Sequence, residues 1–121
     1  MRMEKFNFEE LKVYQKALLF VDKVYLETQK FPKEEIYGLS SQFKRASISI
    51  ALNIAEGAGS TDREFRRYLQ IALNSTKECV VCLEIARRQL FLETIDFENY
   101  RKDLAEISRM ITSLMKYLST K

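Results

Sequence analysis

The chain has 121 residues, of which 46% are hydrophobic and 31% are charged, and its formal net charge is +3. This size and balance are typical of one globular domain with a single core. Three glycines and one proline are too few for the turns of a sheet-rich fold, so an all-helical protein is favoured. A net charge this small permits an anionic partner without requiring one.

The chain contains no histidine. Serine and cysteine triads use histidine as their base, and di-iron helical bundles need Glu-x-x-His pairs. The sequence has no glycine-rich phosphate loop either. We therefore expect no enzyme activity, no catalytic residue, no metal site and no cofactor. The alternative is a metal-dependent nuclease, which would need clustered acidic residues.

The N-terminal sequence MRMEKFNFEE is charged and lacks the apolar stretch of a signal peptide. No run approaches the roughly 20 apolar residues that cross a bilayer. The sequence thus predicts a cytoplasmic protein without membrane contact. Two cysteines with no secretory signal fit a reducing compartment, in which both are free thiols.

The first predicted helix covers residues 8–30. Its apolar residues recur with helical spacing, which predicts one buried face. That face consists of Phe8, Leu11, Tyr14, Leu18, Val21, Tyr25 and Thr28. Phe31-Pro32 ends the helix, because the residue before a proline avoids the helical conformation.

The second predicted helix covers residues 39–56 and ends at Gly57 and Gly59. It is apolar around most of its circumference, apart from a thin polar stripe on one side. The stripe is Gln42, Arg45, Ser49, Asn53 and Glu56. Such a helix belongs in the middle of a bundle or at an interface between chains. The stripe is interpreted as a structural network that fixes helix pairing, with a ligand site as the alternative.

Apolar residues that lie off the core face favour assembly. The second helix carries Phe43, Ile50 and Ile54 on one face and Ile48 with Leu52 on another. Val81 lies on the otherwise polar side of the third helix. A four-helix monomer buries one stripe per helix, so the extra residues indicate a homo-oligomer. The alternative is a monomer in which the second helix is deeply central.

The third predicted helix covers residues 62–92, with Thr61 and Glu64 as a capping box. Its core face runs from Phe65 to Leu90. The fourth covers residues 96–118, capped by Thr94 or Asp96. Four such helices with short connections predict an antiparallel up-down-up-down four-helix bundle, as a single domain over 1–121. Two helical hairpins that complete their core only by association are the alternative.

Basic residues concentrate in the middle of the chain, where residues 36–92 hold eight Lys/Arg and five Asp/Glu. The planar fork of arginine suits phosphate, so these residues are candidate nucleic-acid contacts. The candidates are Arg63, Arg66, Arg67, Lys77 and Arg88, with Lys44 and Arg45 on the second helix. The alternative is a solvated face balanced by nearby acids.

Cys79 and Cys82 form a lone CxxC inside the third helix. A zinc site needs about four ligands, and a redox CxxC normally starts a helix after a strand. We interpret both cysteines as small buried residues, with a zinc site shared between subunits as the alternative.

Several phrases together resemble a known family. They are residues 8–17 (FEELKVYQKA), Phe31-Pro32 with Glu35 and Gly38-Leu39, Ser41-Gln42 with Arg45-Ala46, and Ser49-Ile50 with residues 53–57 (NIAEG). These look like the bacterial proteins encoded by intervening sequences of 23S ribosomal RNA genes. The same superfamily includes the accessory variability proteins of diversity-generating retroelements. The resemblance covers about residues 6–92.

The resemblance implies a four-helix bundle that assembles into a five-membered ring, and it implies nucleic-acid binding, RNA favoured, through a basic surface. Two positions depart from the family pattern. Ala51 stands where the family usually has a proline, and Ser60 stands near a position that is often arginine. The function that we predict is a nucleic-acid-binding or accessory protein, with a protein–protein scaffold or adaptor ring as the alternative.

Overall fold

The computed structural model describes residues 3–121, which form four long α-helices and two short 3₁₀ helices. The elements are η1 (Asn7–Glu10), α1 (Lys12–Thr28), η2 (Lys33–Glu35), α2 (Leu39–Gly57), α3 (Asp62–Arg88) and α4 (Thr94–Thr120). No strand occurs within the described residues. The prediction of an all-α protein with four helices is confirmed.

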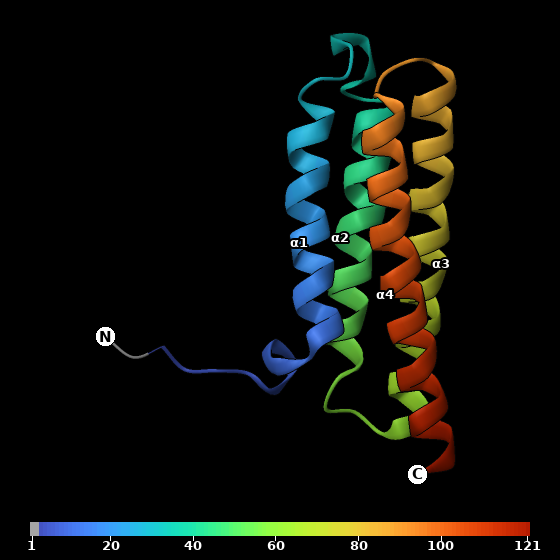
Figure 1. Ribbon diagram of the computed structural model, residues 1–121. Helices are drawn as coiled ribbons and strands as arrows, with labels where there is room; N and C mark the ends of the chain where they lie inside the picture. Colours follow the sequence, from blue (N-terminus) through green and yellow to red (C-terminus); the bar gives the residue numbers. More distant parts are fainter. Residues whose placement is uncertain (1–2) are drawn as a thin grey trace.

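The four helices lie side by side along one long axis (Figure 1). In that view the chain passes up α1, back down α2, up α3 and down α4. Among the long helices that contact each other, α2 and α3 pack most extensively and α1 and α4 least. The segment before η1 leads away from the bundle, near the end where α2 passes into α3 (Figure 1).

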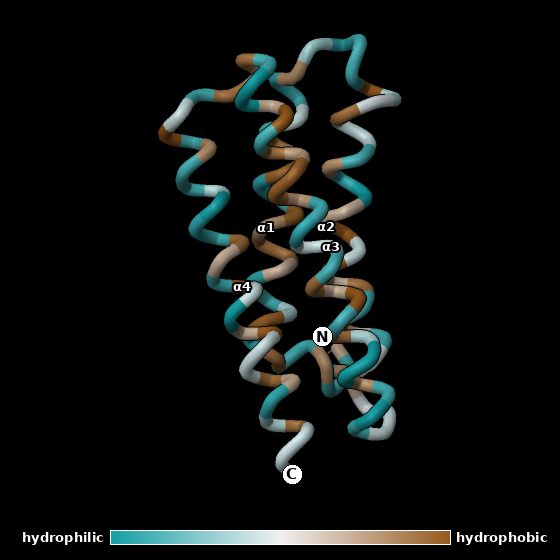
Figure 2. Tube along the Cα trace, turned by 90° about the vertical axis from the view of Figure 1, so that its right-hand side faces the viewer, coloured by the Kyte–Doolittle hydropathy of each residue, from teal (hydrophilic) through white to brown (hydrophobic). Residues whose placement is uncertain are grey.

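One hydrophobic core runs the length of the bundle, and every long helix contributes to it. Apolar segments alternate with polar ones along each helix in Figure 2, as amphipathic helices require. The largest fully buried apolar side chains are Phe20, Val24, Phe43, Ile50, Ile54, Leu69, Leu83, Leu104, Ile107 and Ile111. All three core residues expected on the second helix are among them, so that helix is largely enclosed by a single chain.

The start of α1 differs from the prediction of one helix over residues 8–30. Residues 7–10 form η1, and Leu11 then takes an extended conformation before α1 begins at Lys12. The Glu9 carboxylate accepts a hydrogen bond from the Phe6 backbone N–H, which holds η1 as a separate turn. The helix ends at Thr28, two residues earlier than predicted.

The buried face of α1 was predicted only in part: Thr28 is buried and Leu11 and Tyr14 pack against the core, but the middle of the helix differs. The buried apolar residues are Val13, Ala17, Phe20 and Val24, one position away from the predicted series at Tyr14, Leu18, Val21 and Tyr25. Leu18 and Tyr25 are exposed. Both series have helical spacing, so periodicity alone cannot choose between them. The side on which α2 and α4 pack makes the choice.

One carboxylate is buried between α1 and α4. Glu27 is only 3% exposed, and its Oε1 accepts a hydrogen bond of 2.8 Å from the Tyr100 hydroxyl. Lys30 Nζ lies 4.0 Å from the same oxygen. Burial and then this hydrogen bond raise the pKa of Tyr100. Together these contacts offset the cost of burying the Glu27 carboxylate and join the two helices that otherwise pack least.

The turn between α2 and α3 explains two of the three glycines. A Cβ at Gly57 would lie 2.7 Å from Tyr68 Cβ, so only glycine permits this approach of the two helices. Gly59 has a φ of 89°, a conformation that other residues rarely adopt. Thr61 Oγ1 then accepts a hydrogen bond from the Glu64 N–H, as the predicted cap requires. The Glu64 carboxylate binds Arg67 rather than completing the box.

The end of α3 and the start of α4 also correct the prediction. The helix stops at Arg88 instead of residue 92, because Leu90 adopts a left-handed conformation with a φ of 64°. Leu90, which was placed on the core face, is exposed. Helix α4 begins at Thr94, and its N-cap is Glu93 without a side-chain hydrogen bond, so neither Thr94 nor Asp96 caps it.

Candidate nucleic-acid interface

A continuous row of side chains follows the outward face of α3, at steps of three and four residues. We name this row the basic stripe. It consists of Arg63, Arg67, Gln70, Asn74, Lys77, Val81, Ile85 and Arg88, and all eight are exposed. Because α3 is one unbroken helix, the stripe is straight and its four cations have a fixed order.

The cations of the basic stripe differ in their partners. Arg67 Nη2 lies 3.2 Å from the Glu64 carboxylate, a contact that raises the pKa of Arg67, and its guanidinium also lies over the Tyr68 ring. Arg63, Lys77 and Arg88 form no ion pair with any described residue. These three charges are therefore available to an anionic partner.

Arg66 lies apart from the stripe although it is next to Arg67 in sequence. It is half-buried, and its Nε is shielded from solvent without a hydrogen-bond partner among the described residues. Together with Arg63, Arg67, Thr61 and Glu64 it lines an open hollow of about 550 Å³ at the start of α3. A buried donor without an acceptor is costly, so this guanidinium would gain from an anion in the hollow.

The two candidates on α2 do not extend the stripe equally. Lys44 points toward α1, where its ammonium lies 5.3 Å from the centre of the Tyr25 ring. It is therefore separated from the α3 cations by the width of α2. Arg45 is exposed and forms no ion pair with a described residue. Of this pair only Arg45 belongs to the outer surface beside α3.

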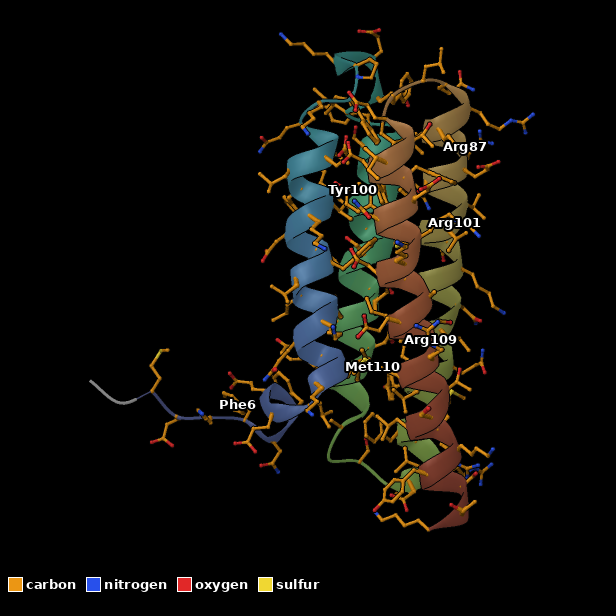
Figure 3. The ribbon with its side chains drawn as sticks, viewed as in Figure 1. Phe6, Arg87, Tyr100, Arg101, Arg109 and Met110 are labelled. Carbon is orange, nitrogen blue, oxygen red and sulfur yellow. The ribbon has the colours of Figure 1, made fainter. Side chains whose placement is uncertain are left out.

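A second group of arginines lies where α3 meets α4. Glu84 accepts two hydrogen bonds, of 2.8 and 2.7 Å, from Arg87. This contact, with the charges of Arg88 and Arg101 behind it, lowers the pKa of Glu84. The Arg87 and Arg101 guanidiniums both lie over the Phe97 ring. Arg87 and Arg101 lie near the same end of the bundle in Figure 3.

Sequence reasoning missed Arg101 as a member of this group. It sits on α4, where acidic and basic residues balance, so local charge gave no signal. The spacing of Phe97 and Arg101, four residues apart, was the available clue, because such pairs face each other on a helix.

The polar stripe of α2 divides into an inner and an outer part. Ser49 Oγ accepts hydrogen bonds from Ser75 of α3, at 2.8 Å, and from Asn53 Nδ2, at 3.0 Å. Gln42, Arg45 and Glu56 are exposed. The structure thus brings Ser49 and Asn53 into one contact with α3 and leaves the other three in solvent.

Both cysteines lie inside α3 as expected for small core residues. Cys79 is fully buried, Cys82 is nearly so, and both are free thiols. Burial raises the pKa of Cys82 to about 11 and that of Cys79 further. Neither sulfur is a thiolate near neutral pH, so neither is a ready nucleophile.

A group of exposed apolar side chains lies where α1 and α2 meet. We name it the apolar face. It comprises Leu18 and Tyr25 of α1 with Leu52 of α2, all more than 40% exposed. Beside them, an apolar groove of about 250 Å³ runs between the two helices, lined by residues such as Val21, Ile48 and Ala55. Leu52 was expected here. Leu19 and Leu26 are also exposed, but they lie on the other side of α1, where they line a hollow with Asp103 and Glu106 of α4.

No group of three or more histidine, cysteine, aspartate or glutamate side chains in residues 3–121 is placed to hold a metal ion. Within the same range, none of the helices combines the length and the hydropathy that crossing a bilayer demands.

Fold and surface together define the class: a small all-α protein of four helices that carries a basic stripe on one helix and an apolar face on two others. The chain belongs to the family of 23S rRNA-intervening sequence proteins, whose family model matches residues 9–113. This bears out the resemblance to that family.

The fold is similar to that of a solved bacterial protein. A protein of unknown function from the S23 ribosomal protein family of Bacteroides thetaiotaomicron matches with a TM-score of 0.78 and 27% sequence identity. The match covers 86% of this chain and 98% of that one. No curated protein matches the chain. The established knowledge therefore extends to the family and the fold, and not to an activity.

Proposed function

We propose that this protein is a non-enzymatic, cytoplasmic nucleic-acid-binding or accessory protein, with RNA as the favoured partner. The observation that carries the proposal is the basic stripe, in which three of four cations have no acidic partner. Side chains of this kind bind phosphates without reading sequence. The family description, which refers to 23S rRNA, adds support for RNA.

The contacting residues are Arg63, Arg67, Lys77 and Arg88, with Arg66 in the hollow at the start of α3 and Arg45 beside the stripe. Lys44 has a smaller role, because its ammonium is directed at Tyr25. A filter-binding titration with RNA over a range of salt concentrations tests the proposal. We expect log affinity to fall linearly with log salt, since bound cations release counterions. Absence of binding at low salt, or affinity indifferent to salt, would refute it.

We further propose that the functional form is a homo-oligomeric ring of antiparallel four-helix bundles, with five subunits as the family resemblance implies. The apolar face supports this, because a contact between subunits would remove its exposed Leu18, Tyr25 and Leu52 side chains from water. Repetition of the basic stripe around a ring would multiply its affinity for a polyanion. The same kinship would extend to the accessory proteins of diversity-generating retroelements.

Sedimentation analysis tests the assembly. A pentamer has five times the 14.3 kDa of the chain. A species that stays at the mass of one chain at every concentration would remove the ring and leave nucleic-acid binding to be judged on the stripe alone.

The second candidate is a protein–protein scaffold, in which the apolar face recruits a protein partner directly. Capture of partners with and without nuclease treatment separates the two functions. A partner that is retained after the RNA is removed supports the scaffold, whereas one lost with the RNA supports nucleic-acid binding.

A further inference from the structure

Arginines gather at both ends of α3. The first arginine cluster is Arg63, Arg66 and Arg67 around Glu64, and the second is Arg87, Arg88 and Arg101 around Glu84. Each cluster holds three guanidiniums and one carboxylate, so each keeps a positive charge after its internal ion pair. The helix between them is unbroken, and at ~1.5 Å per residue it separates the clusters by about 33 Å.

Each cluster can accept a phosphate without breaking its ion pair. In the first, Arg63 is exposed, Arg66 Nε lacks an acceptor, and both border the open hollow. In the second, Arg87 is engaged by Glu84, while Arg88 and Arg101 are exposed and form no ion pair with a described residue. Arginine forks oriented in this way bind phosphate oxygens by paired hydrogen bonds.

The surface between the clusters offers no place for an unpaired base. The basic stripe contains polar, basic and aliphatic side chains, and no aromatic one. Proteins that hold single strands combine a basic groove with aromatic rings on which bases stack. Here the outward face of α3 is a straight helix surface with cations at its ends and Lys77 between them. Such a surface contacts a sugar–phosphate backbone and leaves the bases alone.

The distance between the clusters matches a property of the double helix. In B-form DNA, one strand returns to the same side of the duplex after each turn, about 34–36 Å along the axis. The ~33 Å between the clusters is close to this repeat. Lys77 lies about midway between the clusters. The exposed Glu78 and the uncharged Val81 and Ile85 occupy the same interval and would lie over a groove, where no phosphate needs a partner.

We propose that α3 binds double-helical nucleic acid lying along its length, with the two arginine clusters on backbone phosphates one helical turn apart. This rests on the proposed nucleic-acid function and adds to it the form of the ligand, a duplex of at least one turn. The chemistry recognised is the paired phosphodiester backbone, which duplex RNA and duplex DNA share.

The dependence of affinity on ligand length tests the proposal that the ligand is a duplex of at least one turn. Fluorescence anisotropy at fixed low salt is recorded with labelled duplexes of about 6, 9, 12 and 15 base pairs, as RNA and as DNA, and with single strands carrying equal numbers of phosphates. We expect affinity to rise at least tenfold between the duplexes shorter and longer than one turn. We also expect the long duplex to bind at least tenfold more tightly than the single strand of equal charge. The RNA and DNA series show which duplex is preferred.

Variants locate the second contact. Arg88→Ala with Arg101→Ala should abolish the rise beyond one turn and leave the affinity for the shortest duplex unchanged, because that duplex occupies the first cluster alone. Lys102→Ala with Lys116→Ala removes two exposed α4 charges outside both clusters and should keep the rise. Circular dichroism confirms that each variant is folded.

The outcomes separate the two proposals. The duplex proposal is wrong if single strands bind as tightly as duplexes, or if affinity increases smoothly with length without a rise at one turn. Either result would leave the proposed nucleic-acid function intact. A rise that survives in the Arg88→Ala, Arg101→Ala variant overturns the role of the second cluster. Failure of every ligand to bind at low salt overturns both the duplex and the function.

Discussion

The outward faces of α3 and α1 are equally open to water and differ in chemistry. Along α3 the exposed residues are mainly cations and amides, which water solvates well. Along α1 they include Leu19 and Leu26, each more than 60% exposed. The first face suits a highly charged partner that exchanges with solvent, and the second suits a lasting contact that excludes water.

The comparison also assigns Val81 and Leu52 to different surfaces. Their exposures are close, 58% and 62%, yet Val81 lies between Lys77 and Arg88 on the basic stripe, whereas Leu52 borders the apolar groove. An exposed apolar residue is thus informative only with its neighbours. This pair provides a matched control for the experiments below.

The largest expected effect is on nucleic-acid binding. Replacement of Arg63, Arg67 and Arg88 by alanine should weaken binding at low salt at least about 100-fold and lower the salt slope by about three, one for each lost phosphate contact. Salt-dependent anisotropy measures both values. As a control, alanine at the exposed Lys12, Lys102 and Lys116 removes equal charge from other faces. Equal losses in both variants would mean that the stripe has no special role.

Assembly should respond to the other face. Leu52→Asp should weaken each subunit contact by about 2 kcal/mol or more, because a buried leucine would be replaced by a charge. Sedimentation would then show smaller species, while Val81→Asp should keep the wild-type mass. If both variants, or neither, change the mass of the assembly, the assignment of Leu52 and Val81 to different surfaces is wrong.

The exposed leucines of α1 are evidence for assembly only if α1 packs stably against the rest of the bundle. The hydrogen bond between α1 and α4 allows this packing to be tested. Tyr100→Phe removes the hydrogen bond to the buried Glu27 and should lower the free energy of unfolding by about 1–3 kcal/mol. Urea denaturation measures the loss. Tyr117→Phe, at an exposed tyrosine of the same helix, should change stability by less than about 0.5 kcal/mol.

The same tyrosine predicts a pH dependence. The pKa of Tyr100 is raised in the folded protein, first by burial and then by Glu27. The stabilisation of the folded state by the protonated Tyr100 hydroxyl is therefore complete below the ordinary tyrosine pKa of about 10. This stabilisation is lost as the pH rises above that value. Tyr100→Phe should lack this part of the alkaline loss of stability. An identical alkaline profile in wild type and variant would contradict the assignment.

The smallest effect concerns the polar stripe of α2. Ser49→Ala removes the acceptor of Ser75 and Asn53 and should cost about 0.5–1.5 kcal/mol of unfolding free energy. Gln42→Ala, at an exposed position of the same stripe, should cost less than about 0.5 kcal/mol. A loss of nucleic-acid affinity in Ser49→Ala at unchanged stability would argue for a ligand site in place of a structural network.

Much of the fold could be predicted because its signals are local. The scarcity of glycine and proline, the helical spacing of apolar residues and the Gly57–Gly59 turn all act within a few positions of the chain. The ends were less predictable: Leu90 takes a conformation that leucine disfavours, and α4 starts without a side-chain cap. In both places the chain departs from the local preference on which the prediction depended.

The candidate site was predictable only in part. Arg63, Arg67, Lys77 and Arg88 share one helix, and regular spacing therefore placed them on one face. Lys44 depends on a contact between helices, with Tyr25 of α1, and no spacing within one segment reports such a contact. Spacing on α4 indicates the contact of Arg101 with Phe97, but only the packing of α3 against α4 brings Arg101 close to Glu84 and the α3 arginines.

The amino-acid sequence by itself determined the helical class, the number of helices and the outward row of cations on α3, since each follows from periodicity along one segment. Tertiary structure alone decided which of two equally spaced apolar series on α1 is buried, and so which leucines remain in water. The physical reason is that a helix can bury either of two adjacent stripes at similar cost. The neighbouring helices select one of them by packing against it.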